Sequence, residues 1–250
     1  MQGHVSILSV SPEAAAMIAS GGRISTMDGT ADEIYANSLS AGQEKNEKLI
    51  GKVLSSGHTS VLEHCYVNLS FENVSVLAEQ FLIEFRLASF TVKSRRYVDF
   101  SKAGYVSPVF TANVQMAIFE RTVESLFGTY DVLEAAGVPK EDARFVLPYC
   151  FCSNFFCSMN ARELVHVMNE LAYGRGSRIP ELRALGESLF AQCEQQIPFL
   201  AVRKPEAYRQ SDAFCLRQVQ LLTSKAPVTV LAAPQDAEGL ICGAYQLARG

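Results

Sequence analysis

An amphipathic pattern over residues 112–137 is the feature that most constrains the fold. Its apolar side chains recur near one face of a helix, at Val114, Ile118, Val123, Leu126, Tyr130 and Leu133, and Gly137 and Pro139 end it. Two more helical patterns follow at residues 160–174 and 179–200; the first ends at Gly174, and the second has Pro180 in its first turn and closes before Pro198. The sequence therefore predicts a mainly helical chain.

Strand signals are fewer. Residues 66–76 alternate apolar and polar side chains, which predicts a half-buried strand, and residues 43–56 form a short helical pattern that stops at Gly57. Residues 77–90 are too densely apolar for alternation, so we expect a helix that carries Arg86 towards its end. These patterns predict an α/β (α+β), helix-rich fold in one domain over residues 1–220. The pattern decays after that, so residues 221–250 are expected to form a tail or linker.

Composition excludes several classes of protein. The net charge of −4 provides no overall positive field for nucleic acid, and no run of 18 apolar residues would span a membrane. The first twenty residues lack a basic leader, so we expect a cytoplasmic protein with no membrane partner. An odd number of cysteines, seven, favours reduced thiols. Cys150, Cys152 and Cys157 match no common zinc spacing, and we expect them to be buried in an apolar helix.

Four cations crowd into the segment EFRLASFTVKSRRY, residues 84–97. Arg86, Lys93, Arg95 and Arg96 alternate there with hydroxyl groups, among them Ser94, and with aromatic side chains. One interpretation is a solvated charged turn. The other is a pocket for a nucleotide phosphate, because guanidinium groups and hydroxyls donate hydrogen bonds to phosphate oxygens. The residues alone leave both open.

Short catalytic motifs add little. No nucleophile elbow, P-loop or Gly-x-Gly-x-x-Gly turn follows a strand in this sequence. His58 and His64 do not share a helical face, so a polar or ligand-facing loop is favoured over a metal site. RNA or DNA binding through the basic segment is a third class, which the acidic balance of the chain disfavours.

The basic segment resembles the signature of the flavin-dependent thymidylate synthases, Arg-His-Arg-x-x-Ser, then Asn, then Ser-x-Arg-Tyr. Arg86, Ser89, Ser94, Arg96 and Tyr97 occupy its third Arg, its two Ser positions and its Arg-Tyr pair. Three flanking stretches are similar to the same family in order and spacing: GHTSVLEH at 57–64, GVPKEDARFVLP at 137–148 and MNAREL at 159–164. The resemblance covers roughly residues 45–200.

The resemblance implies a function. Enzymes of this family transfer a methylene group from methylenetetrahydrofolate to carbon 5 of deoxyuridine monophosphate, and a flavin (FAD) reduced by NADPH supplies the hydride. It also implies a mixed α/β homotetramer with active sites between subunits. Carried over by position, Ser94, Arg95 and Arg96 would bind the nucleotide phosphate, with Arg144 contributed by another subunit. The residues expected to contact the flavin are Ser60, Arg86, Asn160, Arg162 and His166.

Several positions depart from the family pattern. Glu84 and Phe85 stand where the family has Arg-His, and Thr91 and Val92 stand where it has Asn and an acidic or amide residue. Leu171 occupies the position of an Arg that polarises the pyrimidine, so Arg175, one helical turn later, is expected to replace it, acting in catalysis with Ser94. Two hypotheses follow: a divergent enzyme, or a non-catalytic relative, such as one half of a tandem pair or a partner subunit, that keeps a nucleotide phosphate pocket.

Overall fold

A four-stranded antiparallel sheet forms the centre of the chain, of which the computed structural model describes residues 3–209. The strands are β1 (His4–Val10), β2 (Tyr66–Ser75), β3 (Ala88–Val92) and β4 (Cys152–Asn160), and their order across the sheet is β1-β2-β4-β3. Leu69 of β2 and Phe90 of β3 both pair with Cys157 of β4. The strand expected at residues 66–76 is confirmed by β2.

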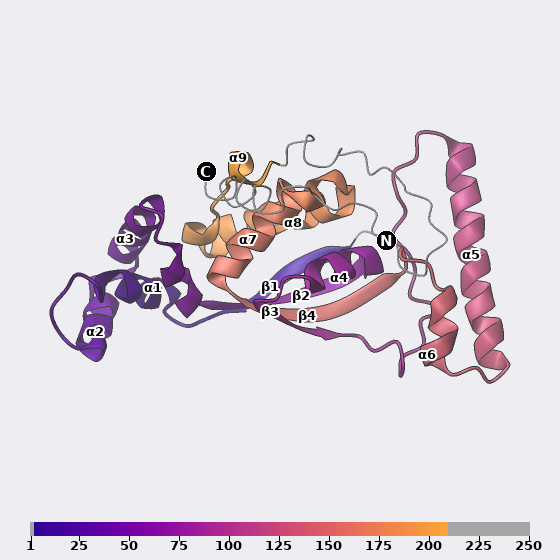
Figure 1. Ribbon diagram of the computed structural model, residues 1–250, viewed down its shortest axis with the longest axis horizontal. Helices are drawn as coiled ribbons and strands as arrows, with labels where there is room; N and C mark the ends of the chain where they lie inside the picture. Colours follow the sequence, from indigo (N-terminus) through magenta and orange to yellow (C-terminus); the bar gives the residue numbers. More distant parts are fainter. Residues whose placement is uncertain (1–2, 210–250) are drawn as a thin grey trace, which may run out of the picture. The chain divides into compact units, whose positions relative to one another are not determined.

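Alternation along the central strands separates the two faces of the sheet. In β4, Phe155, Cys157 and Met159 are buried, whereas Phe156 between them is 60% exposed. The buried side chains face the helices α4 (Val76–Ile83), α7 (Ala161–Ala172) and α8 (Pro180–Gln196), which contact the strands (Figure 1). This arrangement is the two-residue period of a sheet with one covered face.

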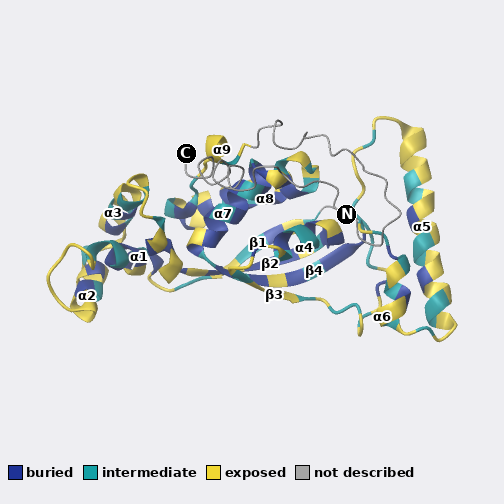
Figure 2. Ribbon diagram, viewed as in Figure 1, coloured by how far each residue is buried: buried dark blue, intermediate teal, exposed yellow. Residues whose placement is uncertain are grey.

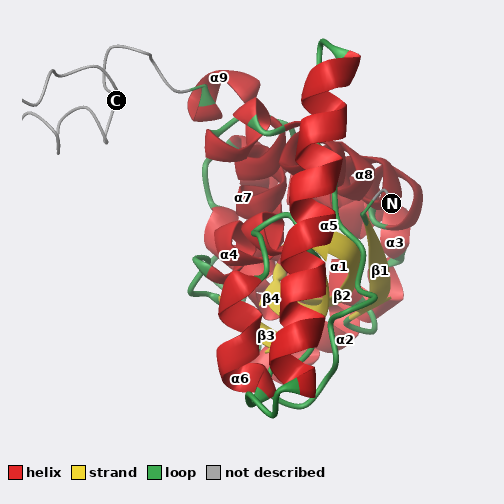
Figure 3. Ribbon diagram, turned by 90° about the vertical axis from the view of Figure 1, so that its right-hand side faces the viewer, coloured by secondary structure: helices red, strands yellow, loops and turns green. Residues whose placement is uncertain are grey.

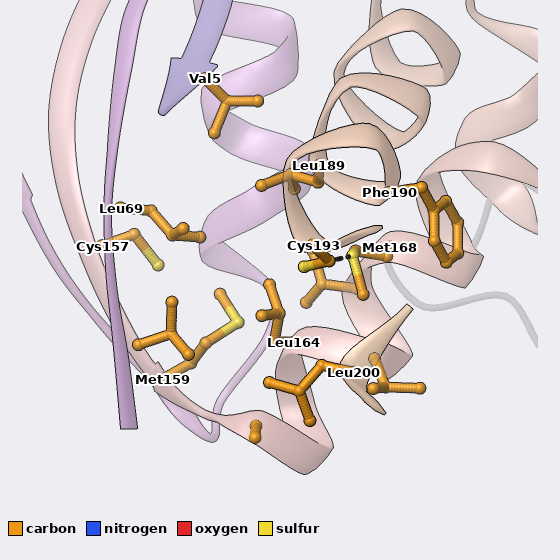
Figure 4. Close-up of a cluster of buried hydrophobic side chains, with 14 of the residues drawn as sticks. Val5, Leu69, Cys157, Met159, Leu164, Met168, Leu189, Phe190, Cys193 and Leu200 are labelled. Carbon is orange, nitrogen blue, oxygen red and sulfur yellow. Dashed lines mark hydrogen bonds between the residues drawn. The ribbon is translucent and has the colours of Figure 1, made fainter. Parts of the chain in front are cut away.

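The main core lies between this face and α7 and α8. Figure 4 shows Leu69, Cys157 and Met159 of the sheet opposite Leu164 and Met168 of α7, with Cys193 of α8 beside Met168, 3.7 Å between the sulfurs. Each leucine or methionine buried here contributes roughly 1.5–3 kcal/mol relative to an exposed one. The helical patterns at 160–174 and 179–200 are thus confirmed, and their apolar faces form the core.

Capping and a buried hydrogen-bond network position α7 and α8. The Asn160 side chain accepts a hydrogen bond from the Glu163 backbone N–H at 2.9 Å and so caps α7. The Glu181 carboxylate, in the first turn of α8, accepts from the Ser75 backbone N–H and hydroxyl at 2.7 and 2.5 Å. The start of α7 is thus fixed at the end of β4, and the start of α8 is held at the end of β2.

Two further groups of helices flank this core. The first consists of α1 (Ala14–Arg23), α2 (Ala31–Ala41), α3 (Gln43–Ser55) and the 3-10 turn η1 (Thr59–His64), and α3 confirms the short helix expected at 43–56. The second contains α5 (Asn113–Ala135), α6 (Lys140–Ala143) and η2 (Arg144–Val146), with α5 running beside α6 (Figures 1 and 3). Short segments η3 (Arg175–Arg178), η4 (Pro198–Leu200) and α9 (Pro205–Tyr208) complete the described chain.

The long helix expected at 112–137 is confirmed by α5, but its apolar stripe is only partly covered. Val123 and Tyr130 are its buried residues, and Tyr130 packs in a second apolar cluster with Phe100 and Phe151. Val114, near the start of α5, is 65% exposed, and much of the helix is exposed in Figure 2.

Two expectations from the sequence are wrong. The helix expected over 77–90 ends at Ile83, and residues 88–92 form β3. A short apolar run that contains Phe90 and Thr91 can form either a helix or a strand, and pairing with β4 favours the strand. Cys152 and Cys157 are buried as expected, but in the strand β4, because Pro148 stops helix formation and the following residues pair with β2. Cys150 was also expected to be buried in a helix, but it is half-buried and lies before β4. The tail expected at 221–250 lies outside the described residues.

No helix within residues 3–209 is long and apolar enough to cross a membrane.

Candidate functional site

A cleft of about 1300 Å³ opens beside α7, between α3, the α4–β3 turn and residues 198–208. Its lining carries five basic side chains (Arg86, Arg162, Arg175, Arg203, Lys204) and three acidic ones (Glu47, Glu84, Glu163). Its aromatic lining consists of Phe85, His166, Phe199 and Tyr208. Binding clefts for small molecules are typically of ~300–1,000 Å³, so this one has room for a dinucleotide.

The basic side chains of the cleft differ in how far they are paired. Arg203 donates to Glu187 at 2.8 Å and Tyr173 at 2.7 Å, and Arg162 donates to Glu63 at 2.5 Å. Arg86, in the turn before β3, is exposed and has no ion pair or side-chain hydrogen bond with any residue of the described range. It is therefore available to a bound anion.

Glu84 does not face the cleft as an isolated negative charge. Its carboxylate accepts from Arg175 at 2.9 Å, and Arg175 also lies 3.8 Å from Glu170 and over the Phe81 ring at 5.1 Å. The negative charge that Glu84 introduces at an arginine position is thus offset by Arg175. Sequence reasoning missed this pair, since 91 positions separate the two residues.

Phe85 replaces a family histidine with an apolar contact. Its ring is 6% exposed and meets the edge of His166 with 5.5 Å between ring centroids. His166 Nδ1 in turn lies 2.8 Å from the Tyr208 hydroxyl. Three rings in edge-on or hydrogen-bonded contact therefore form part of the cleft wall.

Residues 93–97, from here on called the basic segment, follow β3 and lie outside this cleft. The arginines of this segment have partners inside the chain. Arg95 donates to Glu79 at 2.6 Å and stacks over Phe151 at 5.2 Å, and Glu79 also accepts a very short hydrogen bond from Ser153. Glu79 is only 2% exposed and Arg95 17%. Arg95 is therefore part of a buried network, although the resemblance assigns it to a phosphate.

Arg96 and Arg144 both contact Glu141. The Arg96 Nε donates to the Glu141 carboxylate at 2.8 Å, and the Arg144 Nε donates to the Glu141 backbone oxygen at 2.8 Å. The Ser94 hydroxyl accepts from the Arg96 backbone N–H at 3.2 Å. One chain therefore brings three of the four residues expected to bind the nucleotide to a single place on its surface.

The structure separates the two sets of candidate residues. His166 and Arg175 contact Phe85 and Glu84, which precede β3, whereas Ser94 and Arg96 follow its end at Val92. Five residues of strand put these ends ~13 Å apart at 3.3 Å per residue. The two residues expected to act in catalysis, Ser94 and Arg175, are therefore not brought together within one chain.

Three other candidates are placed as follows. Ser60 is exposed and does not line the cleft, although its neighbour Thr59 does, and the Asn160 side chain caps α7. Leu171 is fully buried in the main core. Lys204 and Tyr208 line the cleft and were not found from the sequence, where no motif or periodicity marks them.

Thiols and metals offer little chemistry here. Burial raises the pKa of Cys152 to about 11 and the pKa values of Cys157 and Cys193 to about 12, so these thiols stay protonated at neutral pH. Within residues 3–209, no group of three or more His, Cys, Asp or Glu side chains could hold a metal ion.

Comparison with known proteins connects these features. The model of the Thy1 family, thymidylate synthase complementing protein, matches residues 6–199. A flavin-dependent thymidylate synthase of Nitratidesulfovibrio vulgaris is 31% identical over 209 residues, which is 79% of this chain and 84% of the relative. One from Geobacter sulfurreducens is 34% identical over 65% of this chain and 70% of the relative.

A solved structure has the same fold. It is the UMP/dUMP methylase PolB of Streptomyces cacaoi bound with 5-Br dUMP, with a TM-score of 0.65 and 21% identity. The match covers 80% of this chain and 93% of that one.

Proposed function

The chain belongs to the Thy1 family of flavin-dependent thymidylate synthases, and on this premise we propose that it methylates a pyrimidine nucleotide monophosphate. The proposed substrate is deoxyuridine monophosphate, with methylenetetrahydrofolate as carbon donor and NADPH as reductant. The observation that carries the proposal is the cleft, in which Arg86, unpaired among residues 3–209, lies beside the aromatic group of Phe85, His166 and Tyr208.

The residues of the cleft fit a flavin dinucleotide. Arg86 and Arg162 are exposed cations for a pyrophosphate, His166 offers a hydrogen-bonding ring, and the aromatic wall suits a planar ring system. Glu84 would repel a phosphate, but its pairing with Arg175 offsets most of that charge. When bound, a flavin supplies the hydride. Ser60 and Asn160 fit less well, because Ser60 lies outside the cleft and the Asn160 side chain is used as a cap.

Ser94, Arg96 and Arg144 are the proposed phosphate-binding residues for the nucleotide. Arg96 has to exchange Glu141 for the phosphate, and this exchange is inexpensive because the pair is 60% and 48% exposed and such pairs contribute about 0–1 kcal/mol. A guanidinium–phosphate contact is stronger than that, since the phosphate accepts two hydrogen bonds at once. Arg95 would hold the segment in place through Glu79.

Arg175 is proposed to stabilise negative charge on the pyrimidine. Leu171, at the position of the family's arginine, is buried and apolar, whereas the Arg175 guanidinium lies in the cleft. Glu84 and Glu170 hold it there, so its orientation is set before the substrate arrives.

The active site is proposed to form between copies of the chain. Arg175 and Ser94 lie beyond opposite ends of β3, so a substrate that contacts both needs the cleft of one subunit and the basic segment of another. A homotetramer, as the family resemblance implies, supplies such pairs of surfaces.

Thymidylate formation tests the proposal. The purified chain is supplied with FAD, NADPH, methylenetetrahydrofolate and deoxyuridine monophosphate, and the product is separated chromatographically. We expect product from the parent chain, a loss of at least 100-fold with Arg175→Leu, and no change with Arg183→Ala, which removes an exposed arginine of α8 outside the cleft. No product from a parent chain that binds both FAD and the nucleotide would contradict turnover.

A non-catalytic member of the family is the second candidate. The burial of Leu171 and the pairing of both Arg95 and Arg96 with glutamates favour it. In this case nucleotide binding, measured by calorimetry, would persist without turnover, and mixing with an active family member would be the next measurement.

A further inference from the structure

Residues 201–208 form a strap that lines the cleft, and they lie beyond the segment that the family model matches, which ends at residue 199. Val202, Arg203, Lys204 and Tyr208 all contribute to the cleft wall. These side chains thus lie outside the segment that the family model matches.

Asn169 anchors the strap to α7. This fully buried side chain donates to the Val202 backbone oxygen at 2.8 Å and accepts from the Lys204 backbone N–H at 2.7 Å. Because a buried amide group that loses a hydrogen-bond partner has a desolvation cost, the two hydrogen bonds fix the position of the strap backbone.

Arg203 fixes the strap a second time. Its guanidinium donates to Tyr173, Glu187 and Glu194 and stacks over the Phe190 ring at 4.2 Å. The strap is therefore held firmly in the wall, with Lys204 directly before α9 and Tyr208 as the last residue of α9.

Unlike Asn169 and Arg203, which anchor the strap, Lys204 and Tyr208 each have a group that can contact a ligand. The Lys204 ammonium has no acidic partner among residues 3–209, so together with Arg86 it is an unpaired cation of the cleft. Tyr208 contacts His166 with its hydroxyl and leaves its ring against the cleft, 5.5 Å from the imidazole centroid.

The hydroxyl of Tyr208 also orients His166. Burial raises the pKa of Tyr208, with Glu170 and Glu163 adding to the shift, so the phenol stays protonated at neutral pH and can donate to Nδ1. A neutral imidazole that accepts at Nδ1 carries its proton on Nε2, which becomes a hydrogen-bond donor for a ligand oxygen.

From these contacts we propose that the strap contributes two ligand-binding residues to the cleft: Lys204, which binds a phosphate of the dinucleotide, and Tyr208, which packs against its ring system and positions His166. The proposal rests on the proposed function, because it takes the ligand of this cleft to be a flavin dinucleotide.

Ligand fragments separate the two roles. FAD carries both a ring system and a pyrophosphate, riboflavin carries the flavin ring without phosphate, and ADP carries the pyrophosphate without the flavin. Dissociation constants for all three are measured by calorimetry or flavin fluorescence on the full chain, and far-UV circular dichroism checks that each variant is folded.

Lys204→Ala is expected to weaken FAD and ADP about tenfold and to leave riboflavin unchanged, because a charge-assisted hydrogen bond to phosphate is lost. Lys204→Arg should restore most of the FAD affinity. Tyr208→Ala should weaken FAD and riboflavin about tenfold but not ADP, and Tyr208→Phe, which keeps the ring, about threefold. Lys45→Ala, an exposed lysine of α3 outside the cleft, is the matched control.

Each outcome decides something. Parent-like FAD affinity in both alanine variants overturns the role of the strap and leaves the proposed function standing. An equal loss of affinity for FAD, riboflavin and ADP would indicate a general structural role, and it would also overturn the ligand-binding role of the strap. A parent chain that binds no FAD overturns the proposed function and this inference with it.

Discussion

The cleft and the basic segment differ in the ion pairs that their cations form. In the cleft, Arg86 and Lys204 are unpaired within the described residues, whereas in the basic segment Arg95 is paired with Glu79 and Arg96 with Glu141. An unpaired cation binds an anion directly, and a paired one must first release a carboxylate. Under the proposed function, the cleft can bind its ligand directly, whereas Arg96 has to release Glu141 before it binds a phosphate.

Within the basic segment, the two ion pairs themselves differ. Glu79 is 2% exposed and serves Arg95 and Ser153, whereas Glu141 is 48% exposed and lies on the surface. Water screens the second pair and not the first, so the two should contribute very differently to stability. This suggests that Arg95 is structural and Arg96 functional, although they are neighbours in the sequence.

The largest effect is expected from Glu79→Ala. It leaves the Arg95 guanidinium mostly buried without a carboxylate, and breaking a buried pair in this way costs about 3–5 kcal/mol. Urea unfolding should show the loss as a lower midpoint. Arg95→Met with Glu79→Leu, which replaces both charges, should recover part of it, and an unchanged midpoint in Glu79→Ala would contradict the structural role of the pair.

A substitution in the cleft and one in the basic segment are expected to lower activity by similar factors. Arg86→Ala removes one of the cleft cations that have no ion pair among residues 3–209, and Arg96→Ala removes the proposed phosphate contact; each should lower the rate of thymidylate formation by about 10–100-fold. If the site combines the cleft of one subunit with the basic segment of another, mixed oligomers regain intact sites.

Mixing the two variants therefore tests the separation of the regions. After co-expression in equal amounts, about a quarter of the sites would combine an intact cleft with an intact basic segment, provided subunits assemble at random. Activity near a quarter of the parent value would support a site between copies. Mixed samples no more active than either variant would show that both regions serve a site within one chain.

How far the sequence predicts this comparison depends on the range of each contact. The family motifs, the long α5 and the alternation of β2 are local patterns, and all were predicted from the sequence. The strands β3 and β4 were missed because their apolar density suits helix or strand, and only pairing between them decides.

The charges were harder still. Glu84, which stands at an arginine position of the family, pairs with Arg175, 91 positions away, and Arg96 pairs with Glu141, 45 positions away. No local pattern indicates such partners. The sequence therefore predicts which residues carry charge at a site but not which charges are already paired there.

Glu84→Gln should make the cleft more favourable for an anion. It removes one of the two carboxylates that hold Arg175, and the pair is 45% and 57% exposed, so FAD affinity should rise by only about threefold. Fluorescence titration at low and moderate salt would detect this, with the gain shrinking as salt screens the charges. Weaker binding would mean that Glu84 is needed to orient Arg175.

The smallest effect is expected from Glu141→Gln in the basic segment. Freeing Arg96 from an exposed carboxylate gains about 0.5 kcal/mol, so the affinity for uridylate should increase about twofold while the urea midpoint stays unchanged. Asp142→Asn, an exposed neighbouring acid with no ion pair among residues 3–209, is the matched control for the change in charge. If both variants gain the same affinity for uridylate, the gain comes from the lower negative charge of the surface. Glu141 and the phosphate would then not compete directly for Arg96. If Glu141→Gln alone improves binding, this carboxylate occupies the place that the phosphate takes, and the segment exchanges one partner for the other.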